Sequence, residues 1–417
     1  MKKIFSFYHY LWAFWGNIIY GFPSRNLFVV GVTGTKGKST TLELMSAIMQ
    51  EKGEKTAVLS SVIRKVGAHT QKNKTGNSMP GRMAIQKFLF QAKKAKCSYV
   101  FIEVTSQGVV QHRHKFIDWN AAVFLNLSKE HIESHGSYEA YRKAKISFFE
   151  YVAQSKKKKR IFIVNKDDKE SALFADAVRH NFGNSIFWFS KNEFLRKISD
   201  YVDITSDKAR AKFNEWIFAD FNLENAAAAA TFSETQNVSF ETVQKALSEV
   251  RGVSGRLEVI QKKPFSVIVD YAHTPDSLEK VYTVARKDYC VEPTNALVAI
   301  LGSAGGGRDK WKRIEMGIIA GKMCNEIIVT NEDPFDEDPL EIMNEVKKGI
   351  LQSGFLEQNL KMILDRREAI KQALKQAKKG DVVIATGKGS EEWIRWEKGR
   401  KESWNERKVF EEELEKI

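Results

Sequence analysis

The chain has 417 residues, of which 43% are hydrophobic and 28% charged, a balance that excludes extensive disorder. This length predicts two domains and an extension. Lys and Arg outnumber Asp and Glu by 66 to 52, but no arginine–aromatic signature accompanies the surplus, so we expect a lysine-rich solvated surface and no nucleic-acid partner. The cysteines, Cys97, Cys290 and Cys324, are far apart, which argues against a disulfide framework and fits a reducing cytoplasm.

The chain begins with an apolar run rich in aromatic residues, MKKIFSFYHYLWAFWGNIIYGF. No small-residue cleavage site follows it, which argues against a signal peptide. The run is about 19 residues long, close to the roughly 20 that cross a bilayer, yet polar residues interrupt it. We therefore predict an aromatic helix within residues 1–25 and leave three alternatives open. It could contact a membrane surface through residues 4–22, pack on its own protein or a partner, or span the bilayer.

Strand-like and helix-like segments alternate after this run. Buried strands are expected at 27–34, 99–106, 121–128 and 160–165. Helices are expected at 39–52 and 221–234. We assign this part to a central domain, residues 26–252.

A second series of strands and helices starts near residue 256. Its strands are expected at 257–260, 265–272, 296–303, 326–333 and 381–389. Its helices are expected at 276–287, 310–323, 339–353 and 366–379. The alternation predicts an α/β protein whose parallel sheets carry helices on both faces. The C-terminal domain, residues 253–417, is expected to be Rossmann-like, with the segment 251–255 as the hinge.

The stretch GVTGTKGKSTT, residues 31–41, lies between a predicted strand and a predicted helix. Its glycines allow backbone amides to approach an anion, while Lys38 can reach the terminal phosphates and Ser39 can bind Mg²⁺. The strict pattern G-x-x-x-x-G-K-[ST] fails at one place, because residue 32 is Val. The context still predicts a nucleoside triphosphate site in a P-loop ATPase domain with a parallel sheet, and a cytoplasmic location. It leaves the reaction open.

Two downstream segments carry side chains that a metal could use. Glu103 ends a predicted strand at the sheet edge where open α/β sheets bind ligands, so it could share Mg²⁺ with Ser39 or be a solvated acid. His131 and His135 lie four residues apart in NLSKEHIESHG. Their H-x-E-x-H order is not that of zinc proteases and no third ligand is evident, so we do not predict zinc.

Seven segments in order resemble the Mur ligases, which use ATP to form amide bonds on peptidoglycan precursors. They are TGTKGKST, EVTSQGVVQHR, FLNLSKEHIESHGSYEAYRKAKISFF, DYAHTPDSLEKV, GGGRDKWKR, EDPFDEDP and TGKGSEEW. The later segments are most similar to the member that adds the third peptide residue. The resemblance covers residues 27–395.

The resemblance implies roles for individual residues. The phosphates would be held by Gly34, Thr35, Lys36, Gly37, Lys38, Ser39 and Thr40. The catalytic and metal-binding residues would be Lys38, Ser39, Glu103, His131 and Lys145. The nucleotide would also contact Asn165, Asp168, Asn222, Asn225, Asp270, Tyr271 and His273. The substrates would contact Pro80, Ser106, Arg113, Arg308, Asp333 and Glu391.

Lys145, in the helix segment AYRKAK, falls where the family carries a lysine carbamylated by CO₂. A carbamate turns the cation into an anion with two oxygens, which suits a hard metal ion. The alternative is an ordinary surface lysine.

The sequence departs from the family at three places. Glu130 replaces an Asp, and Ser390 replaces the His of a Gly-Lys-Gly-His-Glu segment. Phe335 stands where members that use diaminopimelate have an Arg that pairs with the distal carboxylate, so diaminopimelate is disfavoured. The acids around it, Glu332, Asp333 and Asp336, suggest a cationic amino acid such as lysine.

The aromatic run takes the place of the domain that normally holds the uridine end. We expect residues 77–82 to serve the substrate instead, as the corresponding family segment does.

These observations predict an ADP-forming ligase, expected to be a monomer. It would activate UDP-N-acetylmuramoyl-L-Ala-D-Glu as an acyl phosphate for attack by an amino acid, with ATP and Mg²⁺. Two alternatives stay open: a folylpolyglutamate-type ligase, and a P-loop scaffold that joins nothing and is recruited by its N-terminal helix.

Overall fold

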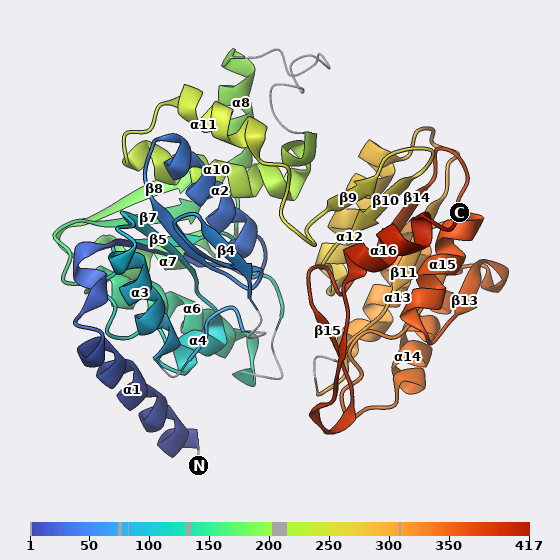
Figure 1. Cartoon of the computed structure of the whole chain (residues 1–417), viewed down its shortest axis with the longest axis horizontal. Coiled ribbons are helices and arrows are strands. Elements are labelled where there is room, and N and C mark those ends of the chain that lie inside the picture. The colour runs from blue at the N-terminus through green and yellow to red at the C-terminus, as the bar shows by residue number, and fades with distance from the viewer. Residues whose placement is uncertain (1, 74–76, 82, 131–134, 202–214, 308–309) are drawn as a thin grey trace. The chain divides into compact units, whose positions relative to one another are not determined.

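The computed structural model describes residues 2–73, 77–81, 83–130, 135–201, 215–307 and 310–417. They form two compact units (Figure 1). Unit 1 contains the described residues up to Lys129 and from His135 to Arg251, and unit 2 contains Glu130 and Gly252–Ile417.

Unit 1 is built on a sheet in the strand order β4-β3-β2-β5-β1-β6-β7-β8. The strands are β1 Phe28–Thr33, β2 Thr56–Leu59, β3 Ile63–Val66, β4 His69–Lys72, β5 Tyr99–Glu103, β6 Ala121–Phe124, β7 Arg160–Asn165 and β8 Asn184–Phe189. The predicted strands and the mainly parallel sheet are confirmed, and β3 and β4 add antiparallel pairings at one edge. The loops at 60–62 and 67–68 are too short for a crossover, so they can join only antiparallel neighbours.

Helices cover both faces of this sheet (Figure 1). They are α2 Lys38–Glu51, α3 Ala84–Lys94, α4 Ser106–Val110, α6 Tyr138–Ala153, α7 Ser171–Arg179, α8 Lys191–Tyr201, α10 Asp220–Thr235 and α11 Phe240–Glu249. Helix α2 packs with α10 and α11 on one face, and α4, α6 and α7 pack together on the other. The helices predicted at 39–52 and 221–234 are α2 and α10.

The contact between α6 and β1 places a glycine in the middle of the strand. A Cβ at Gly31 would overlap the ring of Phe148, and Trp119 approaches from the same side. Phe148 and Trp119 are both fully buried, with ring centroids 5.1 Å apart in an edge-to-face arrangement. Helix α6 therefore lies directly against β1, which fixes where Lys145, one turn before Phe148, can reach.

Unit 2 contains a second sheet in the order β13-β12-β11-β14-β10-β9. Its strands are β9 Glu258–Gln261, β10 Ser266–Val269, β11 Leu297–Leu301, β12 Glu326–Val329, β13 Leu360–Met362 and β14 Val382–Ala385. All the pairings are parallel except β9–β10, whose connection at 262–265 is again too short for a crossover. The Rossmann-like expectation is confirmed, with an antiparallel edge strand added.

The helices of unit 2 also form two layers (Figure 1). They are α12 Pro275–Val284, α13 Trp311–Met323, α14 Pro339–Gln352, α15 Arg366–Gln376 and α16 Glu406–Leu414. Helices α12, α13 and α14 pack in series, while α15 and α16 pack on each other. A ribbon of β15 Trp393–Arg395 and β16 Lys401–Ser403 follows β14. Short helical turns lie at Pro23–Asn26, Glu215–Phe218, Ala285–Tyr289, Glu357–Asn359 and Glu397–Gly399.

The N-terminal aromatic run forms helix α1, Lys2–Ile19. One face packs on unit 1, where the rings of Tyr10 and Phe14 lie 4.9 and 5.3 Å from the ring of Phe116. Within the described part of the chain, no helix combines the length and apolar character that crossing a bilayer requires.

Candidate functional site

The phosphate loop lies at the carboxyl end of β1, between the ends of its two neighbours. β1 pairs in parallel with β5 on one side and β6 on the other. Glu103 is the last residue of β5, and Asn126 follows β6. The carboxyl edge of the parallel strands is where α/β proteins bind ligands, because connections that leave neighbouring strands toward opposite faces of the sheet open a crevice there.

The loop leads into α2, whose first residues are Lys38 and Ser39. Lys38 Nζ donates to the carbonyl oxygens of Gly34 and Thr35 at 3.0 and 2.9 Å, and lies 4.0 Å from Glu103 Oε1. Ser39 Oγ donates to Glu103 Oε2 at 2.8 Å. The side chains of Lys38, Ser39 and Glu103, which were predicted to act together, therefore lie next to one another.

Glu103 is 3% exposed and receives a further hydrogen bond from the backbone of Ser61, 2.8 Å away. Ser61 Oγ also lies 2.8 Å from Ser39 Oγ. A buried carboxylate beside hydroxyl oxygens is a set of hard donors, the kind that Mg²⁺ takes in proteins. Ser39 and Glu103 therefore fit a magnesium ion. Ser61 was not predicted, although it follows β2 at the same edge of the sheet.

Gly37 brings the loop close to α10. Its φ of +84° is in the left-handed region, and a Cβ there would overlap Asn225 Oδ1. Asn225 Oδ1 also accepts from Thr41 Oγ1 at 3.2 Å. The predicted residue Asn225 thus supports the loop from α10, while Asn222 donates to the carbonyl of Trp216 at 3.0 Å.

Lys145 is buried beside the start of the loop, which rules out a surface lysine. It is 2% exposed, its Nζ donates to the Gly34 carbonyl at 2.6 Å, and it lies 4.9 Å from the centre of the Tyr141 ring. The Tyr141 hydroxyl is in turn 3.1 Å from Thr35 Oγ1. Helix α6 therefore delivers two side chains to the loop, of which Tyr141 was not predicted.

A network of amides and acids holds the other side of the loop. Asn126 Oδ1 accepts from the backbone of Lys36 at 2.9 Å. Glu224 Oε1 accepts from Asn126 Nδ2 at 3.2 Å and from Asn165 Nδ2 at 2.9 Å. Asp168 Oδ2 accepts from the backbone of Leu127 at 2.9 Å. Asn165 and Asp168 thus order the segment after β6, and Glu224, which was not predicted, links that segment to α10.

The predicted substrate residue Ser106 begins α4. Its Oγ lies 3.0 Å from His135 Nε2, and Gln107 Nε2 lies 3.3 Å from the same nitrogen. Burial, with the positive charge of Lys145, lowers the pKa of His135 below its ordinary value. The imidazole is therefore neutral at pH 7 and can accept a hydrogen bond.

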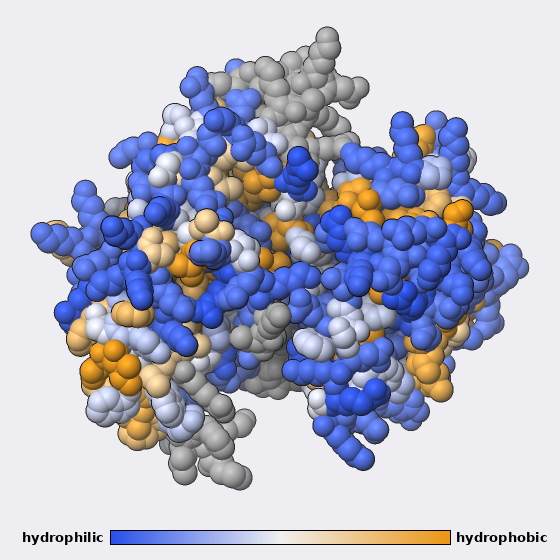
Figure 2. Space-filling view, in the orientation of Figure 1, coloured by the Kyte–Doolittle hydropathy of each residue, from blue (hydrophilic) through white to orange (hydrophobic). Residues whose placement is uncertain are grey.

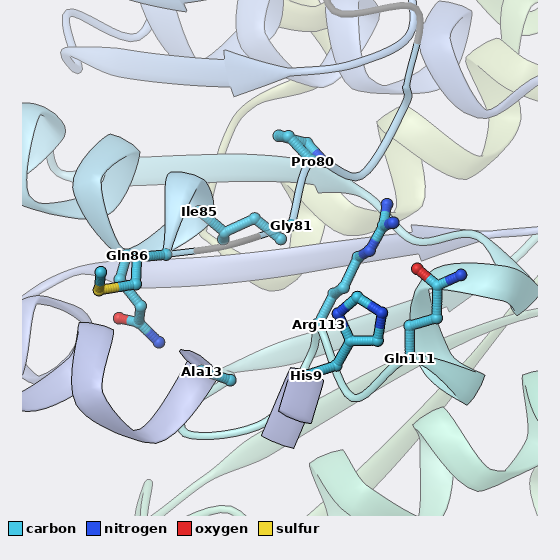
Figure 3. Close-up of a pocket in the computed structure, with 9 residues that line it drawn as sticks. His9, Ala13, Pro80, Gly81, Ile85, Gln86, Gln111 and Arg113 are labelled. Atoms are coloured by element: carbon cyan, nitrogen blue, oxygen red, sulfur yellow. The ribbon is translucent and has the colours of Figure 1, made fainter. Parts of the chain in front are cut away.

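Pro80 and Arg113, also predicted to contact substrate, line one pocket together with helix α1 (Figure 3). Arg113 extends between His9 and the Pro80–Gly81 turn (Figure 3). Its guanidinium donates to the Met79 carbonyl. Within the described residues, Arg113 Nε, Gln111 Oε1 and Gln86 Oε1 are buried without a hydrogen-bond partner.

In unit 2, the predicted residues after β10 hold each other in place. Asp270 accepts from the backbones of Leu257 and Ala272, both at 2.6 Å. His273 Nδ1 lies 2.7 Å from the Tyr271 carbonyl, and the two rings are 4.6 Å apart. Asp270 thus organises the turn that presents Tyr271 and His273.

A buried lysine joins two other predicted residues of unit 2. Lys388 Nζ is 2.8 Å from Asp333 Oδ1 and 2.7 Å from Glu391 Oε2, and its side chain is fully buried. Burial opposes the charge on Lys388, but Glu391 and Asp333 outweigh it and raise its pKa. Asp333 and Glu391 are therefore held by a cation from the segment after β14.

Glu332 lies beside this pair without the same support. It is 5% exposed, and its Oε2 has no hydrogen-bond partner within the part of the chain that the structure describes. Burial raises its pKa, which Lys388 only partly offsets.

His131 and Arg308, two further predicted residues, lie outside the described residues.

Two family models match the chain. "Mur ligase middle domain" matches residues 32–233, and "Mur ligase, glutamate ligase domain" matches residues 255–389.

Curated relatives match most of its length. A UDP-N-acetylmuramoyl-L-alanyl-D-glutamate–2,6-diaminopimelate ligase of Halalkalibacterium halodurans is 32% identical over 378 residues, or 89% of this chain and 75% of the relative. A UDP-N-acetylmuramyl-tripeptide synthetase of Borreliella burgdorferi is 34% identical over 407 residues, or 94% of this chain and 77% of the relative.

Solved structures are also similar to this chain over most of its length. A UDP-N-acetylmuramoyl-L-alanyl-D-glutamate–2,6-diaminopimelate ligase is 27% identical with a TM-score of 0.59, over 94% of this chain and 79% of that one. The folylpolyglutamate synthase of Mycobacterium tuberculosis has a TM-score of 0.65 over 90% of this chain and 92% of that one. At 14% identity, this second similarity shows the fold alone.

Replacing Gly37 by Ala is expected to weaken ATP binding at least about tenfold, because the methyl group must displace Asn225 and an L-residue costs about 1–2 kcal/mol in the left-handed region. Gly53→Ala is a matched control, since Gly53 has φ +94° but no atom within 4 Å of a Cβ. Calorimetric titration with ATP measures both. Equal affinities for the two variants would contradict this role of Gly37.

In protein kept free of CO₂, so that Lys145 carries its ammonium group, the pKa of His135 is expected to lie below its ordinary value and to rise in Lys145→Met, because the variant removes a positive charge that disfavours the imidazolium. NMR titration of the histidine ring signals measures this shift. His112 is the control, since burial, Lys115 and His9 lower its pKa and Lys145 is not among the causes. A His135 pKa that is unchanged in Lys145→Met would show that Lys145 carries no charge beside it.

Proposed function

Because the chain belongs to the Mur ligase family, whose members are ATP-dependent amide ligases that use Mg²⁺ in peptidoglycan synthesis, we propose that it adds an amino acid to UDP-N-acetylmuramoyl-L-Ala-D-Glu. The carboxylate of the dipeptide attacks the γ-phosphorus of ATP, and ADP leaves. The amine of the amino acid then attacks the acyl phosphate, the amide bond forms, and phosphate and a proton leave. We also propose a ligase domain at 26–252 and an amino-acid-binding domain at 253–417.

The observation that carries this proposal is the cluster of Lys38, Ser39 and Glu103 at the phosphate loop. Lys38 brings positive charge to within 4.0 Å of Glu103 and lies on the loop itself, so it can stabilise negative charge as the phosphoryl group transfers. Ser39 and Glu103 would hold Mg²⁺, which supplies further electrostatic stabilisation when bound. His131 is proposed as a ligand of a second ion from its place in the sequence.

We propose that Lys145 is carbamylated in the active enzyme. The Lys145 ammonium loses one proton, and the resulting amine adds to CO₂, forming a C–N bond and releasing a second proton, so a cation becomes an anion. Two observations support this: Lys145 is 2% exposed, and its Nζ lies 2.6 Å from the Gly34 carbonyl. A carbamate there would put negative charge beside the phosphate loop, where a magnesium ion can balance it.

The dipeptide substrate would be bound through Ser106, Pro80 and Arg113. Arg113 and Pro80 share the pocket beside α1, where a guanidinium can donate to the polar groups of such a ligand. His135 keeps Ser106 in place through the 3.0 Å contact. Arg308 is proposed as a further contact from the sequence pattern.

For the incoming amino acid we propose lysine or a similar cation. Glu332 has a buried oxygen without a partner in the described residues, and an ammonium group would supply the missing donor. Phe335 offers no pair to a second carboxylate. Asp333 is already paired with Lys388 at 2.8 Å. Asp336 is exposed and accepts from the backbone of Lys398, so Glu332 is the buried acid that we propose for the cation.

The proposed activity predicts ADP release that requires both the UDP-linked muramyl dipeptide and an amino acid. Across a panel of amino acids, lysine is expected to give the highest kcat/KM and diaminopimelate a value at least about tenfold lower, since a bidentate charged pair is missing. ADP release with folate in place of the dipeptide would indicate the folylpolyglutamate activity. Nucleotide binding without amine-dependent ADP release would indicate the scaffold.

The variant Phe335→Arg separates amino-acid choice from activity. It is expected to raise the diaminopimelate-to-lysine ratio about tenfold or more by restoring the guanidinium. Phe335 already has φ +54°, so the new residue adopts the same backbone conformation. A ratio that stays constant would contradict the role given to this position.

Carbamylation predicts that Lys145→Met raises the Mg²⁺ concentration needed for activity by about 10- to 100-fold. Met keeps the length of the buried chain, so the fold should persist. Protein incubated with ¹³C-bicarbonate should show a carbamate signal in NMR that Lys145→Met lacks. If the wild-type protein shows no such signal and the variant needs no additional Mg²⁺, the carbamate is wrong.

A further inference from the structure

Helix α1 has two apolar faces, of which only one is covered. The inner face packs on unit 1 through Ala13, which is 9% exposed, and through the rings of Tyr10 and Phe14. The opposite face carries Phe7, Leu11, Trp15, Ile18 and Ile19 at helical spacing. Three of these are more than half exposed: Phe7 at 63%, Trp15 at 53% and Ile19 at 62%. A surface helix normally turns polar side chains outward, so this face is exceptional.

The apolar surface continues beyond α1. Phe22 is exposed just after the helix, and Phe90 of α3 is 40% exposed with its ring 5.6 Å from that of Tyr20. Figure 2 shows hydrophobic surface in the region that α1 occupies in Figure 1. We call the side chains of Phe7, Leu11, Trp15, Ile18, Ile19, Phe22 and Phe90 the α1 face.

Positively charged side chains border the α1 face, and the acid whose backbone contacts this region, Asp118 beside Ser24, is half-buried. The sequence has no Asp or Glu before Glu43 and none from Lys55 to Ile102, and the next acid, Glu103, is 3% exposed. On α3, Lys87, Phe90 and Lys94 are exposed at the i, i+3, i+7 spacing of one helix face. Arg25 is also exposed, with its guanidinium 4.1 Å from the centre of the Phe22 ring.

We propose that the α1 face binds the surface of an anionic lipid bilayer, with α1 lying in the interface. Trp and Tyr side chains are suited to the headgroup region, and Lys and Arg beside them attract anionic lipids. No described helix is able to cross the bilayer, so the association is peripheral.

The charges also argue against a second copy of this chain as the occupant. A two-fold symmetric dimer through this face would place the positively charged border of one copy, with Arg25, Lys87 and Lys94, against the same border of the other, and like charges repel. Protein–protein interfaces are moreover depleted in lysine. An anionic lipid surface turns the same residues into favourable contacts.

Cosedimentation of the full chain with lipid vesicles tests the proposal. Phosphatidylcholine vesicles with phosphatidylglycerol should bind the protein, and vesicles without it should bind it much more weakly. Trp15→Glu with Ile19→Glu is expected to lower the affinity about 100-fold or more, since two large apolar side chains no longer enter the interface. Lys87→Gln and Lys94→Gln should each weaken binding about fivefold.

The matched control is Phe182→Glu with Val291→Glu, which adds the same charge at apolar residues that are 98% and 71% exposed elsewhere. It should bind vesicles as the wild type does, and both double variants should keep ADP formation in solution. Wild-type protein that ignores anionic vesicles, or a Trp15/Ile19 variant that binds like the control, would overturn the proposal. So would concentration-dependent dimerisation in light scattering that only the Trp15/Ile19 variant loses.

Discussion

The buried carboxylate of Glu103 is the constraint on which the site in unit 1 depends. An ionised carboxylate inside a protein is costly unless charged or polar groups surround it. Here Ser39, the backbone of Ser61 and Lys38 do so, at 2.8, 2.8 and 4.0 Å. Because each of these groups lies in a loop at the carboxyl end of a strand or at the start of the helix that follows it, satisfying one buried charge also assembles the residues proposed to bind phosphate and metal.

The packing of α6 supplies the second half of that arrangement. Phe148 fits against β1 only because residue 31 has no side chain, and Lys145 one turn away then reaches the carbonyl of Gly34 at 2.6 Å. The packing of α6 on β1 therefore fixes both the hydrophobic core and the position of Lys145. A substitution that moves α6 away from β1 would also move Lys145 and Tyr141 away from the phosphate loop.

Unit 2 also contains buried acids, some of which are paired with buried cations. Lys388 satisfies Asp333 and Glu391, and Arg366 satisfies Glu406 at 2.6 Å, while Glu332 keeps an oxygen without a partner in the described residues. Buried pairs of this kind do little for stability but fix the positions of their members. This incompletely satisfied acid is the one that we propose for the cationic amino acid. The α1 face is similar in one respect. A large exposed apolar surface, like an acid without a partner, indicates a contact that the protein makes with another molecule.

The sequence by itself determined part of the elements and the α/β class, but not β2, β3, β4 or β8. Apolar runs located β1, β5, β6 and β7, and the glycine and lysine spacing located the phosphate loop, because both signals are local. Glu103 could be predicted as a ligand because it ends a strand, and strand ends in a parallel sheet converge on one edge. The helix at the N-terminus could be predicted as well, but not which of its faces would be covered.

Only the tertiary structure decided which distant residues meet. Tyr141 lies beside Thr35, Ser61 beside Glu103, and Glu224 between Asn126 and Asn165, and no local pattern marks these pairs. It also placed Lys145 in the interior rather than on the surface, and paired Asp333 with Lys388. The physical reason is that periodicity and propensity are set within a few residues, whereas burial and charge pairing arise only when segments far apart in the chain pack together.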